Sequence, residues 1–214
     1  MSADPPWADF RLEMFGEPYM VWHDGPYFGT IADKHQEDPA LVVRELLAGI
    51  AEGDSVAAQA CRELGELSEA QRSELVALLE KAMPATYGDT RAELATTLHA
   101  LGSSSLSTAD LAKEVCDVLL GVDHWGVRLN AAMRLTSFEP TPRLVEAAAA
   151  GVRDGDYLVR FHSANTLLRW AGRDEDISEV DDLFGLLVDD GGPDGWAEVS
   201  KWLAAEVPLP PVTA

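Results

Sequence analysis

Residues 155–172 read GDYLVRFHSANTLLRWAG, and this stretch decides the fold. Asp156 is the type of residue that caps the start of a helix, and Gly172 is the type that ends one. Between them, small Ala164 and bulky Leu167 lie three residues apart, which places them on one face of a helix. The stretch therefore predicts a single helix with one apolar face.

The same pattern occurs three more times earlier in the chain. Stretches that begin at Asp54, Asp89 and Asp123 each lead to alanines and leucines at matching positions. When the four stretches are aligned, the corresponding positions are 57, 91, 128 and 160, at intervals of 34, 37 and 32 residues. Such spacing is typical of arrays of helix pairs, because one pair cannot bury its apolar face without a neighbour.

The Val-Arg pairs at 127–128 and 159–160, each followed by small residues and a leucine, resemble the second helix of a HEAT repeat. The likeness is strongest to the short variant found in bilin-lyase-like HEAT proteins. Thr90-Arg91 keeps only the arginine, and Val56-Ala57 keeps only the valine. The resemblance covers residues 38–172. It implies an all-α fold, a right-handed HEAT-like α-solenoid of about five helix pairs, which mostly serves as a binding scaffold.

The chain divides into four parts on this interpretation. Residues 1–37 form an irregular N-terminal arm with seven of the sixteen aromatic residues and one short helix near residues 9–15. The HEAT-like repeats follow over 38–172, an acidic capping pair of helices spans 173–207, and a tail occupies 208–214. We expect the arm to cover the apolar face that a terminal repeat exposes; direct contact with a partner is the alternative.

Caps and breakers set the expected helix boundaries. Asp38 and Pro39 open the first helix of the repeats, and Ser68 begins a capping box for the third. The helix between them is expected to run to about Leu67. The apolar residues of the first helix are assigned to one buried face: Val42, Val43, Leu46, Leu47 and Ile50.

The C-terminal pair of helices is expected over residues 177–188 and 193–207, with Trp196 and Trp202 facing inward. Residues 174–198 hold ten acidic residues and no lysine or arginine. Because a terminal repeat needs a polar outer face, we favour a solvated cap over a binding tail for this segment.

The chain carries 37 acidic and 16 basic residues, a formal net charge of −21. Nucleic acids and anionic membranes are bound mainly through lysine and arginine, so this charge argues against both as partners. It favours encounter with a basic protein, and simple solubility or a salt-rich habitat is the alternative explanation. The sequence leaves the oligomeric state open.

The sequence also predicts a cytoplasmic location. No segment has the pattern of a secretory signal peptide, and none reaches the roughly 18 apolar residues of a membrane span. Cys61 and Cys116 lie at apolar positions of helical patterns. We expect small core residues rather than a disulfide, as in a reducing cytoplasm.

The sequence lacks the usual signatures of catalysis and of metal or cofactor binding. The five histidines form no His-x-x-His or His-Glu-x-x-His motif, and no Cys-x-x-Cys, phosphate-binding loop or Gly-x-Ser-x-Gly elbow occurs. We therefore expect no catalytic residues, no metal and no cofactor, and predict that the protein is not an enzyme.

The HEAT resemblance also implies a structural role for three arginines. In HEAT proteins the arginine at this place in the second helix commonly pairs with an aspartate of a neighbouring repeat, inside the stack. The implied ladder consists of Arg91, Arg128 and Arg160 with Asp89, Asp123 and Asp156.

The return helices supply the candidate binding residues, at positions outside the buried stripe. In HEAT arrays these helices line the concave face, where Leu129, Met133 and Phe161 are expected to form an apolar patch. Polar residues at neighbouring positions form its rim: Asn130, His162, Asn165 and Arg169. An apolar patch with a polar rim is typical of a protein-binding site. The alternative is that the arm or neighbouring side chains bury these residues.

Three classes of function follow. The leading prediction is a non-enzymatic scaffold or adaptor that binds a protein partner on its concave face. An immunity or antitoxin-type protein that neutralises a basic toxin is a more specific alternative. An enzyme of the HEAT-like DNA glycosylase or bilin-lyase type is a further alternative, although a glycosylase needs a basic groove that this sequence does not supply. A structural homo-oligomer would use the same apolar patch.

Overall fold

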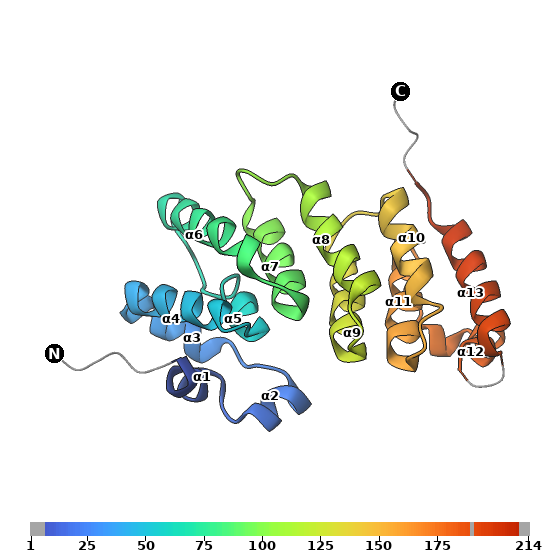
Figure 1. Ribbon diagram of the computed structural model, residues 1–214, viewed down its shortest axis with the longest axis horizontal. Helices are drawn as coiled ribbons and strands as arrows, with labels where there is room; N and C mark the ends of the chain where they lie inside the picture. Colours follow the sequence, from blue (N-terminus) through green and yellow to red (C-terminus); the bar gives the residue numbers. More distant parts are fainter. Residues whose placement is uncertain (1–6, 189–190, 210–214) are drawn as a thin grey trace. The chain divides into compact units, whose positions relative to one another are not determined.

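The computed structural model of the chain describes residues 7–188 and 191–209, and these residues are helical without any strand (Figure 1). The expectation of an all-α fold is therefore confirmed. Parts of the predicted arm, acidic segment and tail lie outside the described residues, at 1–6, 189–190 and 210–214.

The helices group into two compact units that divide between Ser107 and Thr108. This division falls inside residues 38–172, which the repeat pattern treats as one continuous array. The N-terminal unit contains α1 (Trp7–Phe15), α2 (Pro18–Asp24), α3 (Gly29–Glu37), α4 (Pro39–Ala51), α5 (Ser55–Ala60), α6 (Glu69–Ala82), η1 (Met83–Ala85) and α7 (Gly88–Leu101). The C-terminal unit contains α8 (Thr108–Gly121), α9 (Trp125–Arg134), η2 (Leu135–Ser137), α10 (Pro142–Gly151), α11 (Tyr157–Trp170), η3 (Ile177–Glu179), α12 (Asp181–Leu187) and α13 (Gly192–Glu206).

Several helices begin where the capping residues predict. The Asp38 carboxylate accepts a hydrogen bond from the Leu41 amide at 3.0 Å and starts α4. Ser68 and Gln71 form the predicted capping box of α6. The Asp156 carboxylate accepts hydrogen bonds from the first amides of α11, which satisfies donors that a helix start leaves unpaired.

The N-terminal arm is helical, so the prediction of an irregular arm is wrong. Residues 7–37 form α1, α2 and α3, and Gly16 and Gly25 separate them with φ angles of +84° and +81°. Glycine adopts such angles without strain. The two glycines therefore mark the ends of short helices and do not indicate an irregular segment. Trp7 and Phe10 are buried with ring centroids 6.0 Å apart, so part of the aromatic cluster forms a packed core, whereas Tyr19 and Tyr27 are exposed.

This helical arm packs on the first helices of the predicted repeats. Both α1 and α3 contact α4. The Asp54 carboxylate, which caps α5, accepts hydrogen bonds from Trp7 Nε1 at 3.2 Å and from Arg11 Nε at 2.5 Å. A Cβ atom built on Gly49 of α4 would lie 2.5 Å from Trp7 Cε2, so the glycine makes room for the indole ring. The arm therefore covers part of α4 and the start of α5.

Helix α5 is shorter than predicted. It ends at Ala60 rather than near Leu67. The turn that follows brings the Arg62 guanidinium to the Glu93 carboxylate of α7, which is only 3% exposed. A carboxylate buried to this extent requires a charged or hydrogen-bonding partner, and Arg62 supplies one.

Cys61 and Cys116 are free and buried, as expected for small core residues. Burial raises the pKa of both thiols, that of Cys61 to about 12. Because the thiolate is the reactive form of cysteine, neither side chain is set up as a nucleophile near neutral pH.

Arg128 joins the loops that precede two consecutive return helices, but its carboxylate partner differs from the predicted one. Its guanidinium forms a bidentate salt bridge with the Asp154 carboxylate, donating from Nε at 2.7 Å and from Nη2 at 2.9 Å. The carboxylate of Asp156 is engaged instead by the amides that start α11. Asp123 accepts a hydrogen bond from Arg128 through its backbone carbonyl.

Arg160 and Arg91 bind backbone carbonyls. Arg160 donates from Nε to the Leu187 carbonyl at 3.0 Å and from Nη1 to the Asp154 carbonyl at 2.9 Å. Its guanidinium carbon lies 3.9 Å from the centroid of the Trp196 ring. Arg91 donates to two carbonyls at and just after η1. The arginines of the predicted ladder thus hold loops in place through carbonyl groups as well as through Asp154.

The C-terminal pair of helices differs from expectation at one tryptophan. Leu187 of α12 and Leu203 of α13 are buried, but Trp202 is 39% exposed and lies against the Arg173 guanidinium. The prediction that Trp202 faces inward is therefore wrong. Val199 and Leu203, four residues apart, form the buried face of α13, and position 202 falls outside it.

Gly49→Ala tests the packing of the arm on α4. The added methyl group meets the Trp7 ring and the Ala57 side chain, so we expect a lower melting temperature and a loss of about 1–3 kcal/mol, as for other overpacked cores. Gly121→Ala is the matched control: a Cβ there meets open space, so stability should stay the same or rise slightly. Thermal unfolding followed by circular dichroism makes the comparison, and equal melting temperatures would contradict this position of the arm.

Candidate functional site

Five of the seven predicted binding residues line one hollow in the C-terminal unit. The hollow has a volume of about 510 Å³ and lies along α11 and the C-terminal end of α9, two helices that pack against each other. The predicted residues in its lining are Met133, Phe161, His162, Asn165 and Arg169. The other walls come from Thr136, Thr166 and residues 172–176. We call this site the α9–α11 hollow.

Met133 and Phe161 form the apolar part of the hollow. Met133 is 40% exposed, and Phe161 is half-buried. The Phe161 ring lies 5.8 Å from the Tyr157 ring and 5.3 Å from the His162 ring, centroid to centroid, so it is held on two sides. The arrangement leaves an apolar surface that a partner can cover.

Leu129 and Asn130 do not line the hollow, although the repeat pattern groups them with the other five residues. Both are half-buried, and they lie one turn before Met133 on α9. Leu129 and Phe161 hold corresponding positions in the repeat alignment, but only Phe161 lines the hollow, whose wall of residues 172–176 follows α11. Equivalent positions in two repeats therefore have different surroundings.

The sequence-based reasoning missed the wall formed by residues 172–176. Asn165 holds this wall: its Nδ2 donates to Asp176 Oδ2 at 2.7 Å, and its Oδ1 accepts from the Ile177 amide at 2.7 Å. Asp176 in turn caps η3. Gly172 marked the end of α11 in the sequence, but the return of the following loop to the side of α11 depends on this long-range bonding by Asn165.

The charges around the hollow are mixed. Arg169 and Asp174 are both exposed, and the side chain of neither forms a hydrogen bond or ion pair with another residue that the structure describes. Arg173 is engaged, since it pairs with Glu175 and lies over the Trp202 ring. The rim therefore presents one available cation and one available anion to a partner.

His162 is the imidazole in the lining of the hollow. Burial lowers its pKa below the usual 6.5, and the nearby Asp176 carboxylate opposes this shift by favouring the charged ring. The ring is therefore neutral at pH 7 and offers one hydrogen-bond donor and one acceptor. Because the folded-state pKa is lowered, the contribution of His162 to stability is present above pH 6.5 and is lost as the pH falls through the folded-state pKa.

The hydroxyl groups of the lining are already hydrogen-bonded. The two threonine hydroxyls are occupied, since Thr136 donates to the Met133 carbonyl and Thr166 to the His162 carbonyl, both at 2.9 Å. Across residues 7–188 and 191–209, no group of three or more His, Cys, Asp or Glu side chains is placed to hold a metal ion. None of the helices described is both long and apolar enough to cross a membrane.

Asn165→Ala tests the support of the 172–176 wall. The change leaves the Ile177 amide and the Asp176 carboxylate without this partner, so we expect faster amide hydrogen exchange over residues 174–180 and a loss of about 1–3 kcal/mol. Asn130→Ala is the control, because Asn130 forms no side-chain hydrogen bond with the described residues. Unchanged exchange in Asn165→Ala would show that the wall is held by other contacts.

A proton NMR titration tests the environment of His162. We expect its ring resonances to titrate below pH 6.5. Asp176→Asn removes the carboxylate that favours the charged ring, so the pKa of His162 should fall further. The His35 resonance, in the other unit, should not respond to this change. A rise in the His162 pKa in Asp176→Asn would contradict the geometry.

Comparison with known proteins identifies no relative. No model of a protein family matches the chain, and neither the curated proteins nor the solved structures contain a match. The HEAT resemblance therefore rests on the repeated residues alone, and a function has to be inferred from the site itself.

Proposed function

We propose that the protein is a non-enzymatic scaffold of the HEAT-repeat type that binds a protein partner at the α9–α11 hollow. One observation carries this proposal: five of the seven residues selected from the repeat pattern as partner-binding line a single hollow. An apolar centre of Met133 and Phe161 lies beside the exposed side chains of Arg169 and Asp174 and the His162 ring. This composition is typical of the centre and rim of a protein interface.

The packing of the C-terminal unit supports the HEAT-like part of the proposal. Return helices α9 and α11 contact each other, as do the preceding helices α8 and α10. The Arg128–Asp154 pair ties together the loops that precede the two return helices. Parallel stacking of helix pairs with an arginine between successive loops is the arrangement that the repeat implies. We extend it to a right-handed, HEAT-like α-solenoid of about five helix pairs, with the hollow on its concave face.

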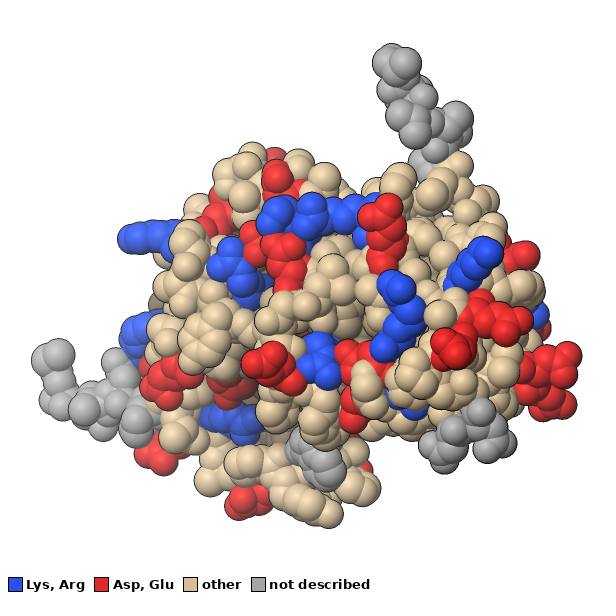
Figure 2. Space-filling view, turned by 45° about the vertical axis from the view of Figure 1, so that its right-hand side comes forward, with Lys and Arg blue, Asp and Glu red and all other residues tan. Residues whose placement is uncertain are grey.

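The charge of the chain favours a basic partner. With a net charge of −21, the protein attracts basic surfaces and repels anionic ones at long range. The face shown in Figure 2 carries acidic and basic side chains with wide uncharged areas between them. Long-range attraction therefore speeds encounter, and the apolar centre of the hollow, Met133 and Phe161, provides the contact that persists after docking.

Phe161→Ala is the central test of this function. A partner captured from the native host and identified by mass spectrometry is titrated by calorimetry against the variants. Truncation of a central aromatic anchor costs about 2 kcal/mol or more, so we expect affinity to fall by more than roughly thirtyfold. Arg169→Ala should weaken binding less and mainly alter the salt dependence of association, since Arg169 lies on the rim.

Leu129→Ala is the matched control for this test. It truncates the residue at the corresponding position one repeat earlier, outside the hollow, and should retain nearly the affinity of the unmodified protein. A melting curve for each variant separates loss of binding from loss of fold. If Phe161→Ala melts early yet binds normally per folded molecule, or if Leu129→Ala weakens binding as much, the hollow is not the binding site.

A further inference from the structure

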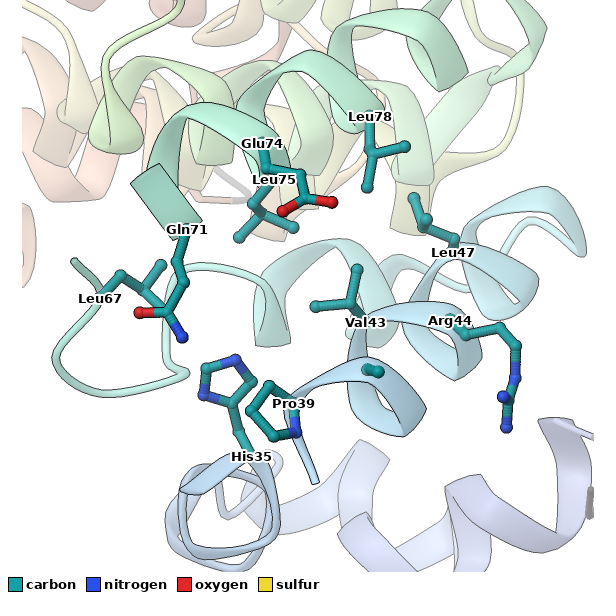
Figure 3. Close-up of a pocket in the computed structure, with 11 residues that line it drawn as sticks. His35, Pro39, Val43, Arg44, Leu47, Leu67, Gln71, Glu74, Leu75 and Leu78 are labelled. Atoms are coloured by element: carbon teal, nitrogen blue, oxygen red, sulfur yellow. The ribbon is translucent and has the colours of Figure 1, made fainter. Parts of the chain in front are cut away.

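A second cavity, in the N-terminal unit, carries an inference independent of the α9–α11 hollow. It has a volume of about 450 Å³ and opens between α4 and α6 (Figure 3). Its main walls are aliphatic, with Val43 and Leu47 from α4 facing Leu75 and Leu78 from α6. We call it the α4–α6 cavity.

Helix α4 has two apolar faces, and only one is used for packing. Val42, Leu46 and Ile50 are at most 2% exposed. Val43 and Leu47 are only half-buried, and Figure 3 shows them directed toward α6. The expectation that all five residues form one buried face is therefore wrong. The second face borders open volume instead of a packed core.

The cavity has the size of a small-molecule site. Such sites have volumes of about 300–1,000 Å³ and are lined mainly by apolar side chains with a few polar groups. One turn of a partner helix, with a diameter of about 10–12 Å, already occupies on the order of 500 Å³. A cavity of 450 Å³ therefore suits a small molecule better than a helix of several turns.

The charge available in the cavity is negative. Glu74 is exposed and lines the cavity, and its carboxylate forms no hydrogen bond or ion pair with the residues described. Arg44 donates to Glu45 from Nε at 3.2 Å and from Nη2 at 3.1 Å, and Figure 3 shows it turned away from the cavity. His35 is 5% exposed. Burial lowers its pKa below 6.5, although a hydrogen bond with the Leu64 backbone acts in the opposite direction, so the ring is neutral at pH 7.

We propose that the α4–α6 cavity binds a small amphiphilic cation, an ammonium group attached to a hydrocarbon body. The hydrocarbon lies against Val43, Leu47, Leu75 and Leu78, and the ammonium group meets the Glu74 carboxylate. Removal of apolar surface from water on both sides supplies the affinity. The Glu74 carboxylate supplies the preference for positive charge, and the net charge of −21 acts in the same direction.

Three probes with the same hydrocarbon chain test the proposal: n-octylammonium, n-octanol and octanoate. Calorimetric titration of the full chain should show the tightest binding for octylammonium and the weakest for octanoate, a difference of about tenfold. Glu74→Gln should weaken octylammonium binding about three- to fivefold and leave octanol binding unchanged. Glu69→Gln is the matched control, because it removes one carboxylate from the same helix outside the cavity.

Filling the cavity should abolish binding of all three probes. Leu78→Trp places a larger side chain in the open volume, and Val43→Phe does the same from the opposite wall. If both variants fail to fold, the methyl resonances of the unmodified protein decide: octylammonium should shift those of Val43, Leu47, Leu75 and Leu78. Phe161→Ala should bind octylammonium normally, because Phe161 lies in the other unit. A negative result for partner binding at the α9–α11 hollow would therefore leave this test unaffected.

Any of three results would overturn the proposal. They are the absence of saturable octylammonium binding, octanoate binding as tight as that of octylammonium, and unchanged binding to a folded Leu78→Trp variant. A basic amphipathic peptide that shifts the same methyl resonances, where octylammonium does not, would also overturn it and would assign the cavity to a helix of a protein partner.

Discussion

Close packing of the return helices through small side chains is the constraint on which the rest of the structure depends. Ala131, Ala132 and Ala164 are fully buried in α9 and α11, which pack against each other, and the Thr166 hydroxyl lies 3.3 Å from the Ala132 carbonyl. In the N-terminal unit Thr97, at the repeat position that corresponds to Thr166, donates to the Ala58 carbonyl at 2.9 Å. When a helix packs closely on a neighbour through a face of small side chains, its bulky side chains must lie on another face. The α9–α11 hollow follows from this requirement, because Phe161 and Met133 occupy the face that packing leaves free.

The sequence predicted those features that depend on local pattern. The all-α class follows from helical spacing, and the starts of α4, α6 and α11 follow from capping side chains whose partners lie within three residues. Features set by distant partners were missed. The end of α5 depends on Arg62 reaching Glu93, thirty-one residues away in sequence. The wall of the hollow depends on Asn165 reaching across a loop to Asp176.

The candidate sites show the same limit. The repeat alignment placed five residues of the hollow on one face, because register within a helix is a local property. It also included Leu129, since alignment cannot show which of two equivalent positions lines a hollow. The sequence did not predict the α4–α6 cavity, because Val43 and Leu47 have the apolar character and helical spacing of core residues. Their distance from a facing wall is a tertiary property that apolar character does not reveal.

The central claim is that a partner docks at the α9–α11 hollow, and photo-crosslinking tests it most directly. A photoreactive amino acid replaces Met133 in one variant and Leu120 in another; both side chains are exposed, but only Met133 lines the hollow. Irradiation of each variant with the captured partner, followed by mass spectrometry, shows which position the partner covers. The account predicts a covalent adduct from position 133 and none from position 120. An adduct from position 120 alone would contradict it and would place the interface elsewhere on the C-terminal unit.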